Sequence, residues 1–131
     1  MDTKKLEQTV SQLETYVDCW KQLNHYIHLA REKRFDLDDE AQFLEYKCVV
    51  TQELESILAL MEVENPSKEE IHTLIMGCPS IRALSLGNEN DLNALENNWH
   101  RIYIAWHSIL GQLKAAMRQQ GDGEGWSLFK K

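Results

Sequence analysis

The chain has 131 residues, of which 43% are hydrophobic and 27% are charged, with only 2 prolines and 6 glycines. This length and composition predict one folded domain and exclude an intrinsically disordered chain. The formal net charge of −7 disfavours nucleic acid and anionic membranes as partners, because both repel an acidic surface.

The expected cellular compartment follows from the absence of a membrane span, a signal peptide and a disulfide pattern in the sequence. No run of about 18 apolar residues is present, so we expect no membrane span. Residues 1–10 lack the apolar core of a signal peptide. Cys19, Cys48 and Cys78 lie in three separate segments without C-x-x-C spacing, which argues against a disulfide framework or a structural zinc site. We therefore expect a cytoplasmic protein with reduced thiols and no cofactor.

The first predicted helix covers residues 2–34. Its apolar residues recur at steps of three and four, which is typical of one buried helix face: Leu6, Val10, Leu13, Val17, Trp20 and Ile27. The sequence "REKR" at 31–34 places cations where a helix dipole is negative, and "DLDDE" then places anions where the next helix begins. This charge pattern predicts a helix end, and a basic binding patch is the alternative interpretation.

The second predicted helix covers residues 38–63. Phe43, Val50 and Ile57 are spaced by seven, which places them on one face. Pro66 disfavours helical geometry at the residue before it, so the helix should end upstream. Ser67 then begins the sequence Ser-Lys-Glu-Glu, which predicts a capping box at the start of the next helix.

The third segment, residues 67–87, is predicted to be a broken helix. Gly77 and Gly87 are expected to be left-handed stops, and Pro79 is expected in the first turn of a second short helix. The corner between the two glycines is almost entirely apolar, which leaves a packed elbow and an open pocket as alternatives. Cys78, at this break, is either a buried apolar residue or a reactive thiol at a helix N-terminus.

The fourth predicted helix begins at Asn88 or Asn90 and continues to about Gln120. Its apolar residues alternate by three and four as in the seam of a helical bundle: Leu92, Leu95, Trp99, Ile102, Trp106, Ile109, Leu113 and Ala116. Ile104 lies on the opposite side of this helix. An apolar residue there suggests a second contact surface.

Residues 121–131 differ in character from the rest of the chain. Three glycines within five residues predict a flexible hinge, and Trp126, Leu128 and Phe129 follow before two lysines. We therefore divide the chain into a helical domain, 1–120, and an aromatic C-terminal tail, 121–131. The tail could bind its own bundle, a neighbouring subunit or another protein.

These elements predict an all-α protein, an antiparallel up-down four-helix bundle whose third helix is short and broken near Gly77-Pro79. The first and fourth helices would each be about 45 Å long, whereas the broken third segment could span only about two-thirds of that length. Part of the seam on the long helices would then lack an intramolecular partner. This mismatch in length predicts a homodimer or a complex with another protein.

A metal site is the alternative suggested by the repeated Trp-His-x-Ile pattern in "WHRIYIAWHSIL". The candidate ligands come from the first and fourth helices: His25, His28, Glu96, His100 and His107. His100 and His107 are two helical turns apart, about 10 Å along the axis, so they cannot bind one ion without ligands from another helix. Both follow seam residues directly, which favours histidines at the margin of the core.

The sequence therefore predicts a protein–protein interaction module that is not an enzyme, such as an adaptor, a chaperone or a regulatory bundle, and that associates with itself. The expected contact residues are Ile104, Trp126, Leu128 and Phe129. We find no P-loop, dinucleotide-binding fingerprint or EF-hand loop and assign no catalytic residue. The alternative function is a metal-binding bundle, with catalysis left open.

Overall fold

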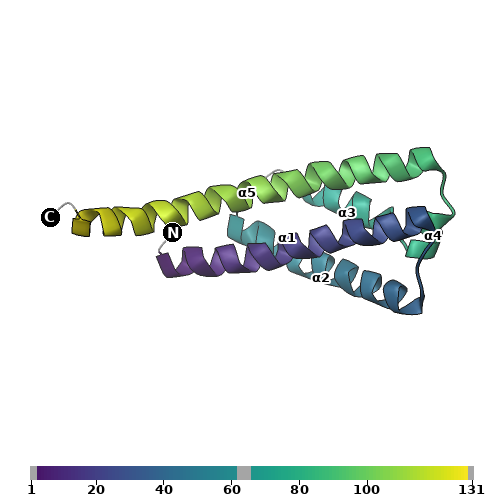
Figure 1. Cartoon of the computed structure of the whole chain (residues 1–131), viewed down its shortest axis with the longest axis horizontal. Coiled ribbons are helices and arrows are strands. Elements are labelled where there is room, and N and C mark those ends of the chain that lie inside the picture. Colours follow the sequence, from purple (N-terminus) through teal and green to yellow (C-terminus); the bar gives the residue numbers. More distant parts are fainter. Residues whose placement is uncertain (1–2, 62–65, 130–131) are drawn as a thin grey trace.

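The computed structural model describes the backbone of residues 3–61 and 66–129 and the side chains of residues 3–60 and 66–119. Within these ranges all regular secondary structure is helical, which confirms the predicted all-α class. The helices are α1 (Thr3–Glu32), α2 (Leu37–Met61), α3 (Lys68–Met76), α4 (Ile81–Ser85) and α5 (Glu89–Phe129) (Figure 1). The molecule is elongated, with α1 and α5 side by side along most of its length.

α1 is the central helix of the structure. It packs against α5, α2 and α4, while α3 packs against α5 and α2. The residues predicted to form its apolar stripe are all buried, so that prediction is confirmed: Leu6, Val10, Leu13, Val17, Trp20 and Ile27. Burial of apolar area on this scale is the dominant favourable contribution to folding.

Aromatic side chains fill the middle of the core between α1, α2 and α5. The ring of Tyr16 makes edge-to-face contacts with Trp106 at 5.3 Å and with Trp20 at 6.5 Å between centroids. The Tyr16 hydroxyl donates to the carbonyl oxygen of Val50 at 3.1 Å, and burial raises the pKa of Tyr16. Trp99 Nε1 donates to the carbonyl oxygen of Trp20 at 2.7 Å. These bonds fix the register of α1 against both long neighbours.

Short side chains begin most of the helices. Asp36 and Asp39 accept hydrogen bonds from each other's backbone N–H at the start of α2, as the acidic sequence there predicts. Ser67 accepts from the backbone N–H of Glu70, which confirms one half of the predicted capping box. The reciprocal bond is not made, because the Glu70 carboxylate pairs with Arg101 instead. Asn88 caps α5 in the same way, through the N–H of Asp91. The helix ends are therefore set largely by local chemistry.

The break between α3 and α4 is made differently from the prediction. None of the described glycines has a positive φ, so Gly77 and Gly87 are not left-handed stops. Gly77 stays right-handed at φ −74, and its N–H bonds back to the carbonyl oxygens of Thr73 and Leu74. Pro79 is not in the first turn of α4, because it precedes the N-cap, Ser80, whose side chain accepts from the N–H of Ala83. The left-handed residue is Lys33, at φ 58, directly after α1.

α5 confirms the predicted seam. Leu92, Trp99, Ile102 and Trp106 are buried, and the remaining seam residues are half-buried: Leu95, Ile109, Leu113 and Ala116. The backbone helix does not end near Gln120 but continues to Phe129. Its C-terminal part extends past the N-terminal end of α1 (Figure 1). The side chains of the predicted tail lie outside the described residues, so the division into 1–120 and 121–131 stays a prediction.

Candidate functional site

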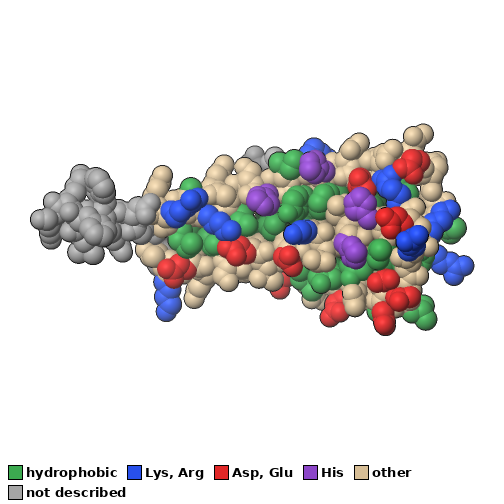
Figure 2. Space-filling view, in the orientation of Figure 1, with side chains coloured by type: hydrophobic (Ala, Val, Ile, Leu, Met, Phe, Trp, Pro, Cys, Tyr) green, Lys and Arg blue, Asp and Glu red, His purple; other side chains and the backbone are tan. Residues whose placement is uncertain are grey.

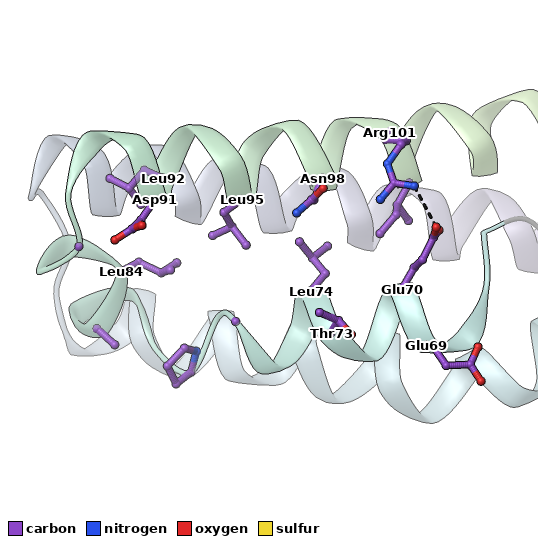
Figure 3. A pocket seen from close by; sticks show the side chains of 15 residues that line it. Glu69, Glu70, Thr73, Leu74, Leu84, Asp91, Leu92, Leu95, Asn98 and Arg101 are labelled. Atoms are coloured by element: carbon purple, nitrogen blue, oxygen red, sulfur yellow. Dashed lines mark hydrogen bonds and ion pairs between the residues drawn. The ribbon is translucent and has the colours of Figure 1, made fainter.

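A groove between α3, α4 and the N-terminal part of α5 is the main candidate site. It has a volume of about 660 Å³, within the range of sites that bind small molecules or the side chains of a partner. Leu74, Leu84 and Leu95 point into the space between α5 and the α3–α4 elbow (Figure 3). The groove therefore has an apolar wall that the described residues leave open to solvent, although Leu74 and Leu84 are themselves largely buried and Leu95 is half-buried.

The elbow next to this groove is also firmly packed. Cys78, Ile81 and Leu84 are buried, with Ile81 completely so, and α4 packs directly against α1. Lys47 of α2 donates to the carbonyl oxygen of Pro79 at 3.2 Å, and Glu40 accepts from the N–H of Arg82 at 2.7 Å. The corner from Gly77 to Gly87 is thus a packed elbow on its inner side and one wall of an open groove on its outer side.

The charges around the groove are mainly negative. Glu69, Glu70 and Asp91 line it, with Arg101 as the cation of the lining. Arg101 is already bound by Glu70, with 2.9 Å between Nη1 and Oε1 (Figure 3). The second carboxylate oxygen of Glu70, Oε2, is buried without a hydrogen-bond partner. The net charge of the lining is therefore negative, which favours a positively charged partner.

The candidate metal ligands lie on the surface over α1 and α5, where histidines border a band of apolar side chains (Figure 2). His25, His28, His100 and His107 are all exposed. Of the five candidates the structure brings together His28 and Glu96, with 4.0 Å between Nδ1 and Oε1. No group of three or more His, Cys, Asp or Glu side chains that could hold a metal ion exists among the described residues.

The histidines of the repeated pattern lie beside the aromatic seam, as their spacing predicts. His100 follows Trp99, whose ring stacks on that of Tyr103 at 4.8 Å between centroids. His107 contacts the same Tyr103 ring from the next turn, at 5.6 Å. The two histidines therefore flank one aromatic stack on opposite sides along the helix.

Arg31 connects the end of α1 with the beginning of α5. Its guanidinium binds Glu89, and it donates to Asn93 at 3.1 Å and to Glu96 at 3.0 Å. The sequence places Arg31 at a helix end but gives no sign of these partners, because they lie on a helix far along the chain. Glu96, a candidate metal ligand, is thus held by an arginine.

The cysteines differ in exposure. Cys78 is buried, and this burial raises the pKa of its thiol to about 11. Burial also raises the pKa of Cys19, whereas Cys48 is exposed on α2. Of the two interpretations of Cys78, the buried apolar residue is therefore confirmed, because a reactive thiol requires a lowered pKa and access to solvent.

Ile104 is the expected contact residue whose side chain is described, and it is 52% exposed on α5. The other three, Trp126, Leu128 and Phe129, lie outside the described side chains. Among the described residues, no helix is both long enough and apolar enough to cross a membrane. No protein-family model, curated protein or solved structure matches this chain.

Proposed function

We propose that this protein is an interaction module rather than an enzyme, and that it forms a homodimer through α5. The observation that carries the proposal is the length of α5: its C-terminal part extends beyond α1, and no other helix of the described residues lies beside it (Figure 1). The ion pair between Lys114 Nζ and Glu14 Oε1, at 3.3 Å, supports this geometry. The part of α5 that follows Lys114 is longer than the part of α1 that precedes Glu14.

A projecting helix of this kind needs a partner. Isolated helical segments shorter than about 12–15 residues are marginal in water, and most helical stability in proteins comes from packing an apolar face. The projecting segment contains three glycines, which weaken a helix by about 1 kcal/mol each relative to alanine. Its sequence also supplies Trp126, Leu128 and Phe129 as apolar contacts. Association between copies gives this segment the packing that its own chain does not provide.

We propose that each subunit is an antiparallel up-down four-helix bundle. In this bundle α3 and α4 together take the place of the short, broken third helix. Pairs such as Gln12 with Ser56 and Tyr26 with Gln42 support opposite directions for α1 and α2. Because α3 and α4 together are shorter than α5, the C-terminal part of α5 is available to a second protein. We place the protein in the cytoplasm, without nucleic-acid or membrane partners, on the basis of its acidic charge and free thiols.

Ile104 tests whether α5 is the contact surface. Ile104→Glu should raise the dissociation constant of the dimer by about tenfold or more, because it places a carboxylate in an apolar contact. Leu44→Glu is the matched control, since Leu44 on α2 is 49% exposed against 52% for Ile104. Sedimentation velocity over a dilution series measures both.

The control should leave the dimer unchanged. Equal dissociation constants for Ile104→Glu and the unsubstituted chain would contradict an interface that includes this face of α5. An equal loss in both variants would contradict an interface that includes Ile104 and excludes the face of α2 that carries Leu44.

A further inference from the structure

The groove between α3, α4 and α5 is preformed and lacks an occupant from its own chain among the described residues. Its apolar wall includes Leu74, Leu84 and Leu95, and about 660 Å³ is enough for two aromatic side chains or one aromatic and one aliphatic. Interfaces of this kind derive most of their affinity from a few aromatic anchors in apolar pockets. The groove therefore suits a short peptide with large apolar side chains.

The charge of the groove specifies the peptide further. Three carboxylates line it, and its arginine is already paired with Glu70. A peptide with positive charge beside its apolar residues would complement these carboxylates.

The C-terminal sequence of this chain has this composition. Residues 126–131 read Trp-Ser-Leu-Phe-Lys-Lys, which combines two aromatic anchors with two adjacent cations. The two lysine ammonium groups are opposite in charge to the three carboxylates that line the groove. No other segment of the sequence joins two aromatic residues to a pair of adjacent lysines in this way.

The segment cannot reach the groove of its own chain while α5 is helical. α5 lines the groove as far as Ile102 and continues as a helix to Phe129, which places Phe129 roughly 40 Å away along the axis. We therefore propose that the groove binds residues 126–131 of a second copy of the chain. The exchange is reciprocal, each copy giving its C-terminal segment and receiving the other's, as in a two-fold symmetric dimer. The proposal rests on the self-association proposed above and names the surfaces that perform it.

Two variants separate the tail from the groove. The tail variant combines Trp126→Ala with Phe129→Ala, and it should raise the dissociation constant of the dimer by about 30-fold or more for each anchor lost. The groove variant is Thr73→Arg, which puts a long cation into the groove against the lysines of the tail and should raise the constant by about tenfold or more. Thr51→Arg is the matched control, because Thr51 is also an exposed helical threonine but lies outside the groove. Circular dichroism and thermal unfolding of each variant check that the fold is retained.

Mixing the two variants tests reciprocal binding directly. In the mixture one intact tail meets one intact groove, so it should contain more dimer than either variant alone at the same total concentration. A mixture no more dimeric than its components would overturn the proposal, and so would a tail variant that dimerises as strongly as the unsubstituted chain. An unsubstituted chain that stays monomeric at every concentration would instead overturn self-association itself, which keeps the two failures distinct.

Discussion

Trp106→Ala should lower the free energy of unfolding by about 3–5 kcal/mol, the cost typical of truncating a fully buried tryptophan. Trp106 is 0% exposed and meets the ring of Tyr16 edge to face, at the centre of the contact between α5 and α1. Its Nε1 is buried without a hydrogen-bond partner, so the loss is one of packing and apolar burial. Equilibrium unfolding in urea, monitored by circular dichroism, measures the change.

His107→Ala is the neighbouring control for this experiment. His107 is exposed, so its removal should change the free energy of unfolding by no more than about 0.5 kcal/mol. A cost near zero for Trp106→Ala would contradict the packing of the α5 seam against α1. A cost for His107→Ala as large as that for Trp106→Ala would contradict the position of the histidines at its margin.

Ile81→Ala is expected to have the second largest effect, about 2–5 kcal/mol of lost stability. Ile81 is the first residue of α4 and is 0% exposed. α4 has only five residues and is held in place by its packing on α1, because so short a helix has little stability of its own. The same urea titration reports the loss, and the groove wall formed by α4 should loosen with it.

Leu86→Ala provides the matched comparison at the other end of α4. Leu86 is 80% exposed, so its truncation should cost no more than about 0.5 kcal/mol. If Ile81→Ala and Leu86→Ala had equal effects, the elbow would not be anchored in the core as described.

The features that could be predicted from the sequence are those that depend on neighbouring residues. The apolar stripe of α1, from Leu6 to Ile27, follows from helical periodicity, and the cap at Ser67 follows from a four-residue pattern. The position of His100 and His107 beside the seam also follows from periodicity, because their spacing is inherited from Trp99 and Trp106. Such features require no knowledge of how the helices pack.

The features that could not be predicted depend on contacts between distant segments. The ion pair of Arg101 with Glu70 and the binding of Arg31 to Glu96 join helices far apart in the sequence, and no local pattern indicates them. The same holds for the groove, whose walls come from three helices. Gly77 was expected to be left-handed because glycine commonly ends helices in that way, yet the turn into α4 is made with right-handed geometry. At Gly77 the packing of the elbow therefore decides the backbone conformation, and the common left-handed conformation of a terminal glycine is not adopted.

The mass of the unsubstituted chain in solution tests the central claim most directly. Sedimentation velocity from nanomolar to high-micromolar concentration should show a species of twice the 15.3 kDa chain mass, dissociating to the monomer on dilution. The account predicts this dimer because α5 extends beyond its own bundle. A mass of 15.3 kDa at every concentration would contradict it.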